Sequence, residues 1–304
     1  MQPLFRNEIV LGLWPIAGVT TIGVTDHDAM ETIAAAIETG ITTFDTAYGY
    51  GLAGESDRYL GRALSQEPNA ERFHVIGKVG QRYVDGERII DGRPETLRRD
   101  AEESLARIGI NRFGTLMLHC IDDQTPIEDS ASALQELKDA GLADRIGVCN
   151  ASCAQRATFA EHADCQAIQC PLNLLQQDNL AGVVDDAFQH RCDVLVYWTL
   201  MKGLLAGKIG RNHEFADGDS RPGYSVFQGE SREHAHRVVD GLTHLANQWG
   251  LSVAAISISW ALSQTGVSAV LVGARRPEQV HEIAHTCILP QEQLESIDKI
   301  IDGA

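Results

Sequence analysis

Short runs of apolar and β-branched residues alternate along the chain with longer segments in which apolar residues recur at helical spacing. No Pro/Ser-rich linker or change of composition interrupts this alternation. It predicts eight parallel strands, each followed by a helix that covers the sheet. The runs that read as strands are Ile9–Leu13, Thr42–Asp45, Phe73–Lys78, Thr115–His119, Arg145–Val148, Ala167–Gln169, Val194–Tyr197 and Ala269–Val272.

The segments between the strands carry the boundary signals of helices. Pro94 and Pro126 lie where a first helical turn tolerates proline, and Gly40, Gly109 and Gly141 lie where a helix C-terminus favours glycine. These signals, together with the apolar spacing, predict amphipathic helices over Asp28–Thr39, Pro94–Ile108, Pro126–Ala140 and Arg232–Trp249.

Eight parallel strands are the number that closes into a barrel. We therefore expect an α/β protein with one (β/α)8 TIM-barrel domain over residues 1–304, with a doubly wound open sheet as the alternative. The region from about residue 207 to 231 has no clear periodicity and is rich in Gly, Asp, Arg and Asn. Loops of this length in a compact domain are usually functional, so we predict a lid over cofactor or substrate.

The charge and the apolar content limit the partners. The chain has 42 acidic and 25 basic residues, a formal net charge of −17, and 44% apolar residues. Such an acidic surface repels nucleic acid and anionic membrane, so we expect neither as a partner. The apolar-rich stretch Leu251–Leu262 is too short to span a bilayer, and the N-terminus lacks the apolar core of a signal peptide. The expected compartment is the cytoplasm.

The cysteines do not form a recognisable framework. There are seven, an odd number, and no Cys-x-x-Cys pair occurs. We expect reduced, mostly buried thiols and not a set of disulfides. Neither the cysteine spacings nor the His119–Asp122 segment matches a usual ligand pattern, so we predict no metal site. The cysteines are Cys120, Cys149, Cys153, Cys165, Cys170, Cys192 and Cys287.

Candidate catalytic groups occur where strands end. The second, third and fourth runs end in Asp45, Lys78 and His119, and Tyr50 follows Asp45 by five residues in a glycine-rich loop. Barrel enzymes place their sites at the C-terminal ends of strands, so these four side chains should converge. Taken singly, each has a structural alternative: a barrel ion pair, a core histidine or a loop aromatic. Their convergence favours catalysis.

The four residues suit proton transfer. Tyrosine has an ordinary pKa of about 10, too high for an efficient acid at neutral pH. At ~4 Å and an effective dielectric of ~20, the attraction of an ammonium for tyrosinate is roughly 4 kcal/mol before desolvation. We therefore expect Lys78 to bring the pKa of Tyr50 toward neutrality, Asp45 to hold Lys78 and His119 to orient a carbonyl.

The loops after the last two strands suit an anion. They are the glycine-containing segments Gly203–Lys208 and Gly273–Gln279, and a helix is expected to begin near Pro277. Arg275 and Arg276 add two guanidinium groups, which are suited to a phosphate monoester. Ordinary surface charge is the alternative, but on this acidic chain we favour phosphate binding.

Two segments resemble nucleotide-binding motifs but do not match them. Gly49–Gly54 reads G-x-G-x-x-G, but the following strand ends in Lys78 and not in an acidic residue. Gly203–Lys208 is one residue short of a Walker loop and is followed by Ile209. We reject both a Rossmann fingerprint and nucleotide hydrolysis.

Four segments together resemble the signatures of the aldo-keto reductase family, in the branch with bacterial aldo-keto reductases and potassium-channel β subunits: Gly40–Gly51, Ser56–Gly61, Ile76–Gly80 and Leu116–Asp122. The resemblance covers essentially the whole chain. It implies hydride transfer between NADPH and an aldehyde or ketone, without a Rossmann fold. It also implies Tyr50 as proton donor, Lys78 tuning it, Asp45 holding Lys78 and His119 in the oxyanion site.

The resemblance further implies cofactor contacts. Asn150 and Gln169 would hold the carboxamide and Tyr197 would stack on the nicotinamide. The phosphate and adenine contacts would come from Gly203, Leu205, Gly207, Lys208, Gly273, Ala274, Arg275 and Gln279. The chain departs from the family at Cys149, where serine is usual, at Trp198–Thr199, where Ser-Pro is common, and at Ile283, where asparagine is frequent. The short N-terminus suggests that the hairpin under the barrel is reduced or absent.

Substrate choice should depend on residues near the barrel mouth. Trp14 and Tyr48 either wall a substrate pocket or pack at the rim, and the turn after Lys78 (residues 81–93) adds to the mouth. We expect a small-molecule carbonyl substrate. An alcohol or sugar dehydrogenase working in the oxidative direction, and a nicotinamide-sensing regulatory subunit, are the alternatives. The sequence does not identify the substrate, the preferred direction of the reaction or the oligomeric state. It also does not decide whether the protein uses NADPH alone or both NADPH and NADH.

Overall fold

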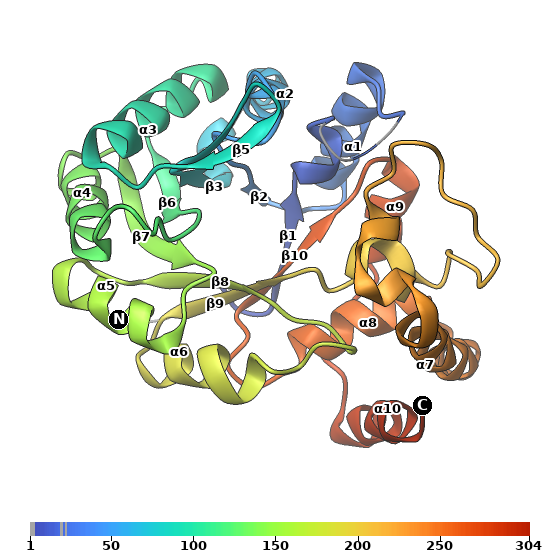
Figure 1. Ribbon diagram of the computed structural model, residues 1–304. Helices are drawn as coiled ribbons and strands as arrows, with labels where there is room; N and C mark the ends of the chain where they lie inside the picture. Colours follow the sequence, from blue (N-terminus) through green and yellow to red (C-terminus); the bar gives the residue numbers. More distant parts are fainter. Residues whose placement is uncertain (1–3, 19–20, 22) are drawn as a thin grey trace.

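The centre of the computed structural model is a closed barrel of eight parallel strands (Figure 1), and the structure describes residues 4–18, 21 and 23–304. Around the barrel the strands follow the order β1-β10-β9-β8-β7-β6-β3-β2, so chain neighbours lie side by side. The predicted TIM barrel is confirmed, and the open-sheet alternative is wrong. The strands are β1 (Glu8–Gly12), β2 (Thr43–Asp45), β3 (His74–Val79), β6 (Phe113–Leu118), β7 (Ala143–Cys149), β8 (Ala167–Pro171), β9 (Asp193–Tyr197) and β10 (Ala269–Gly273).

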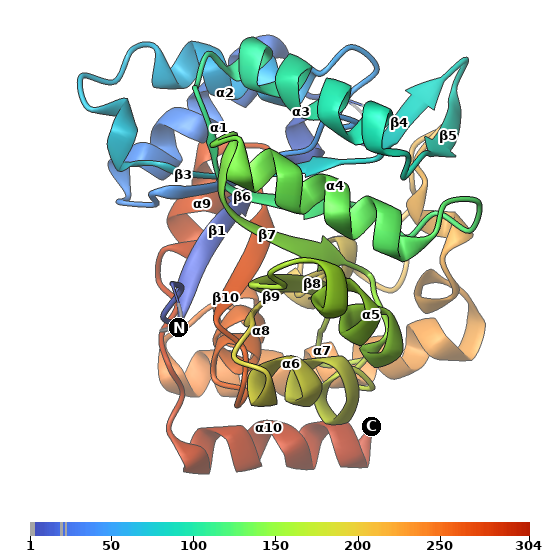
Figure 2. The same ribbon diagram turned by 90° about the vertical axis from the view of Figure 1, so that its left-hand side faces the viewer.

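Helices surround the barrel, as Figures 1 and 2 show. The α-helices are α1 (Asp26–Glu38), α2 (Glu55–Leu64), α3 (Pro94–Ile108), α4 (Ile127–Asp139), α5 (Cys153–His162), α6 (Asp185–Gln189), α7 (Gly229–Trp249), α8 (Val253–Leu262), α9 (Pro277–Ile283) and α10 (Gln291–Gly303). Shorter helical turns are η1 (Trp14–Ile16), η2 (Ala70–Arg72), η3 (Leu180–Val184, a π-helix), η4 (Met201–Ala206), η5 (Arg221–Gly223) and η6 (Ser225–Phe227). Within the described residues, no helix is both long and apolar enough to cross a membrane.

Local signals explain where helices begin and end. Helix α3 has the predicted bounds, with Pro94 in its first turn and Gly109 as a left-handed C-cap at φ 78°. Helix α1 begins two residues before its predicted start, because Thr25 forms a capping box with Asp28. The placement of Pro126 inside α4 is wrong: it is the N-cap, with an extended ψ of 135°.

A hairpin interrupts the strand–helix alternation after β3. Strands β4 (Gln81–Val84) and β5 (Glu87–Ile90) pair antiparallel in the segment that we expected to be a turn. Asp85 and Gly86 join them with φ of 52° and 84°. A two-residue Asp-Gly turn with both φ values positive is a strong hairpin signal, and it was available in the sequence.

The segment from 207 to 228 is a long loop with two short helical turns, η5 and η6, and α7 begins at Gly229. Most of the region 207–231 that we predicted as a lid is therefore a loop, its last residues belong to α7, and its role as a lid stays a prediction. Arg211 holds the loop against α7 through Asp240, with Nη2 to Oδ2 at 2.8 Å. Figure 2 shows this loop and the β4–β5 hairpin at the same end of the barrel, away from the N-terminus.

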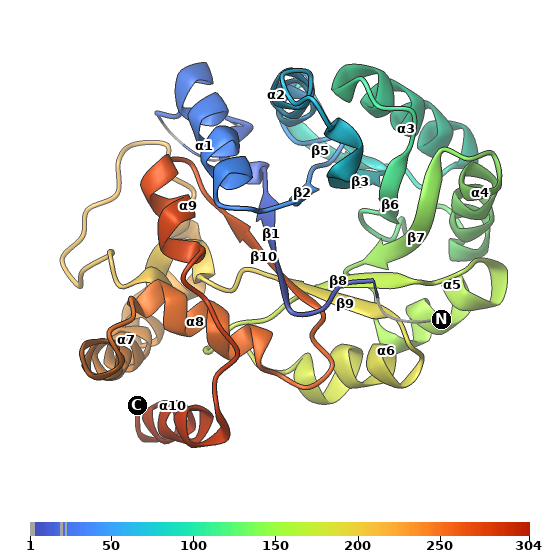
Figure 3. The same ribbon diagram turned by 180° about the vertical axis from the view of Figure 1, so that it is seen from behind.

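Apolar side chains fill the barrel interior. Val10, Ile76, Met117 and Leu195 pack there, together with Phe5 from the segment before β1. This segment crosses the barrel end that faces the viewer in Figure 3, and the Leu4 amide donates to Asp193 at 3.0 Å. In the described part of the chain no strand precedes Glu8. A filled barrel has no pore, so the chemistry falls to the opposite, C-terminal ends of the strands.

Candidate active site

The structure brings the four predicted catalytic residues together. Asp45 ends β2, Lys78 lies near the end of β3, His119 follows β6, and Tyr50 lies in the loop after β2. The ammonium of Lys78 bonds to the Asp45 carboxylate and donates to the Thr46 carbonyl at 3.1 Å and to the Tyr50 hydroxyl at 3.1 Å. The adjacent register of β2 and β3 places these strand ends side by side.

The ion pair at the base of the site is fully buried. Asp45 and Lys78 are 1% and 2% exposed. Burial raises the pKa of Asp45, against the effects of Lys78 and of the Gln169 amide. Burial alone would lower the pKa of Lys78, but the Asp45 carboxylate and the Tyr50 oxygen outweigh it and raise that pKa. Lys78 is therefore a fixed cation at neutral pH.

The expected titration of Tyr50 near neutrality is wrong. Burial raises the pKa of Tyr50 to about 12, and the attraction of Lys78 for the tyrosinate only partly offsets it. Desolvation of the phenolate is the cost that the sequence-based estimate did not include. Tyr50 is a neutral phenol across the physiological range.

The direction of one hydrogen bond decides what Tyr50 can do. Lys78 carries only donors, so the phenol oxygen accepts from it at 3.1 Å. The phenol hydrogen therefore points elsewhere and is free for a substrate oxygen. The Lys78 bond becomes stronger as negative charge develops on the phenol oxygen, because bonds between two ions are stronger than bonds to a neutral acceptor.

His119 is a neutral imidazole beside Tyr50. Their ring centroids are 5.6 Å apart at an interplanar angle of 72°. Burial lowers the pKa of His119 well below its usual value, and the cations Lys78 and Arg88 lower it further. Its buried Nδ1 has no hydrogen-bond partner in the described part of the protein. The ring is thus suited to orient a polar oxygen by hydrogen bonding and not to supply a proton as imidazolium.

The residues expected to hold a nicotinamide lie beside the four. The Tyr197 hydroxyl donates to Asn150 Oδ1 at 2.6 Å, and Asn150 Nδ2 donates to the His119 carbonyl at 3.2 Å. Asn150 therefore links the Tyr197 ring to the backbone of His119. Gln169 is buried and its Nε2 donates to Asp45 Oδ2 at 2.7 Å. The Gln169 amide is therefore bonded directly to the carboxylate that holds Lys78.

The loop after β9 has the backbone freedom that an anion site needs. Gly203 and Gly207 have φ of 93° and 71°, which favour glycine. The Leu205 side chain is buried, so only its backbone could face a ligand. Lys208 is exposed and already forms an ion pair with Glu282 of α9.

Cations gather where β10 ends. Arg275 is half-buried, and its backbone amide donates to Gln279 Oε1 at 2.9 Å, which fixes the turn after Gly273 and Ala274. Burial and the neighbouring Arg221 and Arg276 lower the pKa of Arg275. Such mutual repulsion marks a positive potential that a phosphate would relieve.

Aromatic side chains form one wall of the mouth. The Trp14 ring lies 5.1 Å from that of Tyr50 and 6.5 Å from that of Tyr83, nearly parallel to the latter. Tyr48 instead lies between Arg82 and Arg107, and its hydroxyl donates to Glu103 at 2.8 Å. These contacts favour the rim-packing alternative for Tyr48.

From the sequence we placed residues 81–93 at the mouth, but we did not predict the hairpin or which of its residues contact the site. Tyr83 stacks on Trp14, and Arg88 Nη2 lies 3.8 Å from Cys120 Sγ, next to His119. Arg88 is exposed and forms no ion pair with any described residue. The Asp-Gly turn would have predicted the hairpin, but no local pattern indicates which barrel residues it reaches.

A cation holds the loop near Trp198. Lys202 Nζ lies 5.4 Å from the centroid of Trp198 and 4.3 Å from that of Tyr224, and the two rings are 5.9 Å apart, edge to face. Trp198 is one of the positions at which the sequence departs from the family that it resembles. This cluster attaches the 207–228 loop to the loop after β9.

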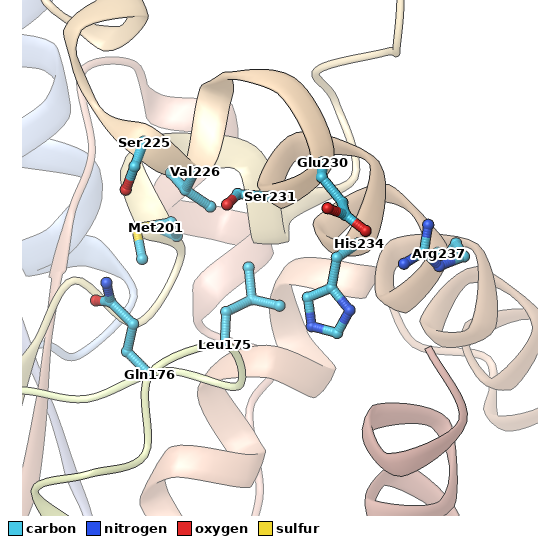
Figure 4. A pocket seen from close by; sticks show the side chains of 9 residues that line it. All are labelled: Leu175, Gln176, Met201, Ser225, Val226, Glu230, Ser231, His234 and Arg237. Atoms are coloured by element: carbon cyan, nitrogen blue, oxygen red, sulfur yellow. The ribbon is translucent and has the colours of Figure 1, made fainter.

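A hollow of about 460 Å³ lies apart from the four catalytic residues, between the loop after β8, η4, η6 and α7 (Figure 4). Its lining includes Glu230, His234 and Arg237 on one side of α7 and Leu175 and Gln176 opposite. None of the candidate catalytic or cofactor residues lines it.

Comparison with known proteins shows to which family the chain belongs. The model of the "Aldo/keto reductase family" matches residues 8–302. The chain is 30% identical to "Aldo-keto reductase YhdN" of Bacillus subtilis (strain 168) over 98% of this chain and 90% of that protein. It is 28% identical to an "NADH-specific methylglyoxal reductase" of Escherichia coli (strain K12), over 91% of this chain and 88% of that protein.

A solved structure with a TM-score of 0.90 is the glycerol dehydrogenase AKR11B4 from Gluconobacter oxydans, 34% identical over 98% of this chain and 92% of that chain. The closed barrel, with Asp45 and Lys78 paired at its strand ends, and the match to the family model together define the class of protein. The chain belongs to the aldo/keto reductase family. It is an oxidoreductase whose family uses nicotinamide cofactors.

Proposed function

We propose that the protein reduces a small polar aldehyde or ketone with NADPH, and that Tyr50 is the proton donor. The observation that carries the proposal is the 3.1 Å bond from Lys78 Nζ to the Tyr50 hydroxyl, which leaves the phenol hydrogen free. The pKa of about 12 keeps that hydrogen in place at neutral pH. A protonated phenol is what reduction of a carbonyl requires.

The residues divide the work as follows. The substrate carbonyl oxygen accepts hydrogen bonds from the Tyr50 hydroxyl and the His119 ring. A bound nicotinamide supplies the hydride. As negative charge grows on the carbonyl oxygen, Tyr50 gives up its proton, and the Lys78 ammonium stabilises the tyrosinate that forms. Asp45 holds Lys78 in position, and Tyr197 and Asn150 form the face on which the nicotinamide ring would lie.

The arginines support NADPH in preference to NADH. Arg275 and Arg276 follow β10, and Arg221, which is paired with Asp219, lies in the loop. Burial first, and then the charges of Arg221 and Arg276, lower the pKa of Arg275. A 2′-phosphate would accept hydrogen bonds there and reduce the repulsion. The "NADH-specific" name of one relative, at 28% identity, is the reason to test this point directly.

The test is titration of NADPH and NADH against the intrinsic tryptophan fluorescence of wild type and Arg275→Ala. We expect NADPH to bind more tightly, and the substitution to weaken it by about 1.5–3 kcal/mol, with NADH affected little. Equal weakening of both dinucleotides would contradict a phosphate contact. Failure of both to bind would remove the hydride-transfer proposal itself.

The mouth supports a short substrate that carries polar or anionic groups. Trp14 and Tyr83 close one side, and Arg88 adds a guanidinium without an acidic partner near His119. A phosphate or carboxylate on the substrate would be attracted to Arg88 while the carbonyl stays at Tyr50. We therefore propose short phosphorylated or acidic carbonyl compounds as preferred substrates.

One comparison supports the oxidative direction of the reaction as a second candidate function. The similar glycerol dehydrogenase is named for the oxidation of a polyol. The same four residues would serve oxidation if Tyr50 is deprotonated, with the tyrosinate as base. Because the pKa of Tyr50 is about 12, we propose that oxidation becomes appreciable only in alkaline solution.

A further inference from the structure

Two cysteines that the catalytic site does not use lie together at the N-terminal ends of neighbouring strands. Cys165 lies between α5 and β8, and Cys192 immediately precedes β9. Strands β8 and β9 pair in parallel with Ala167 opposite Asp193. The active-site residue Tyr197 ends β9, so the cysteines lie at the opposite end of the barrel from the catalytic residues.

The two cysteines are in contact. The Cys192 thiol donates to the Cys165 backbone carbonyl at 2.9 Å. The Asp193 amide donates to the Gln166 carbonyl at 2.9 Å, which continues the strand register to this point. With neighbouring strands ~4.8 Å apart and an offset of one residue, the Cα atoms are roughly 6 Å apart. That separation is within the range that a disulfide spans.

The surroundings favour one thiolate. Arg156 is buried and bonded to Asp186, and its charge acts on both cysteines. The hydrogen bond from Cys165 lowers the pKa of Cys192, and Arg156 lowers it further against the effect of burial. Cys165 is half-buried while Cys192 is 6% exposed, so the pair has access to a small oxidant from the Cys165 side.

The geometry points to an oxidisable pair: Cys165 and Cys192 form a reversible disulfide when hydrogen peroxide or another peroxide oxidises the protein. Cys192 as thiolate attacks a peroxide oxygen and becomes a sulfenic acid, with release of water after proton uptake. The Cys165 sulfur then displaces the sulfenic oxygen as a second water. Two thiols and one hydrogen peroxide give one disulfide and two waters, and each sulfur loses one electron.

The disulfide would stabilise the fold without blocking the site. It would close a loop that contains β8 and α6 and would restrict the unfolded chain. Because the catalytic residues lie at the other end of the strands, the oxidised protein should keep its activity. We therefore expect a higher Tm and unchanged turnover in the oxidised protein.

The experiment treats the folded, full-length protein with a small molar excess of hydrogen peroxide, blocks free thiols by alkylation and digests with trypsin. Cleavage after Arg156, Arg191 and Lys202 places Cys192 alone in one peptide and Cys165 with Cys170 in another. We expect the two peptides linked, with two hydrogens lost, and separated again by dithiothreitol. The same samples are melted with and without dithiothreitol.

Matched serine variants identify the sulfurs. Cys170→Ser should still form the linked peptide, whereas Cys165→Ser should leave Cys192 alkylated or further oxidised and its Tm insensitive to peroxide. A Cys192 peptide that stays fully alkylated in oxidised wild type would overturn the proposal, and so would a linked peptide that disappears in Cys170→Ser. If a variant fails to fold, fragmentation of the linked wild-type peptide still shows which cysteine is joined. Unchanged or lower Tm in the linked protein would refute the stabilising role.

Discussion

At the scale of single residues, Tyr50 shows how burial and charge compete. A lysine 3.1 Å away stabilises the tyrosinate, yet burial of the phenol raises its pKa to about 12. The positions of Asp45, Lys78, His119 and Tyr50 could be predicted because strand ends meet in a barrel. The pKa could not, since it depends on how completely the surrounding side chains exclude water.

The protonation of Tyr50 predicts opposite pH dependences for the two reaction directions. Reduction needs the protonated phenol, so kcat/KM should stay nearly constant from about pH 6 to pH 9. Oxidation needs the tyrosinate, so its kcat/KM should rise by about tenfold per pH unit over the same range. Steady-state kinetics in both directions would measure this, with Tyr50→Phe as the inactive control. A fall of reduction with an apparent pKa near neutrality would contradict the structure.

Arg88 predicts a preference that depends on substrate charge. Arg88→Gln should raise KM about tenfold for glyceraldehyde 3-phosphate, because one charge-assisted contact is lost. KM for glyceraldehyde, which lacks the phosphate, should change little. Arg93→Gln is the matched control, since Arg93 is exposed nearby but already paired with Asp91 at 2.7 Å. Equal changes for the two aldehydes would show that Arg88 does not contact the anion.

At the scale of elements, strands and helices could be predicted where one period persists. All eight barrel strands occur within about two residues of their expected bounds, because buried parallel strands are continuous apolar runs. The β4–β5 hairpin was missed because Arg82, Tyr83, Glu87 and Arg88 are polar or mixed and form no apolar run. Its position depends on contacts with the mouth and not on its own pattern.

One glycine permits the hairpin to approach the catalytic loop. A Cβ atom at Gly49 would lie 2.4 Å from the Gln81 carbonyl oxygen. Gly49→Ala should therefore displace β4 and destabilise the protein by about 1–3 kcal/mol, with a raised KM. Thermal unfolding and kinetics would measure both effects. Gly210→Ala is the control, because nothing lies within 4 Å of a Cβ there. Identical Tm values for the two variants would contradict the contact.

At the scale of the whole molecule, the closed barrel was predictable from the number of strands, but the register of the strand pair that closes it was not. Closure requires β1 to pair with β10 across the length of the chain, and the register of Glu8 with Ala269 through Gly12 with Gly273 is a tertiary fact. The polar residues under the barrel mouth likewise come from distant segments. Asp57 of α2 accepts from Thr46 and from Ser104 of α3, each at 2.7 Å.

Asp57 predicts a pH dependence of global stability. Burial raises the pKa of Asp57 to about 6, against the effects of Thr46 and Ser104. Between roughly pH 4 and pH 6 the folded protein therefore binds more protons here than the unfolded chain, and this carboxyl lowers stability as pH rises through that window. The free energy of unfolding of Asp57→Asn, relative to that of wild type, should increase by about 2 kcal/mol from about pH 4.5 to about pH 7.5.

Urea unfolding of both proteins at the two pH values would measure this difference. The control is Asp217→Asn, at an exposed position on the 207–228 loop. If the Asp57→Asn difference is the same at both pH values, the carboxyl does not change its protonation in that range.

The bond from Gln169 to Asp45 joins β8 to β2 across the barrel, and Asp45 in turn holds Lys78. The position that would recognise the coenzyme and the group that tunes the acid are thus one hydrogen-bonded unit. For laboratory evolution this means epistasis. Substitutions at Gln169 that are selected for tighter coenzyme binding should alter the pH optimum as well, and compensating changes should arise at Asp45 or its neighbours.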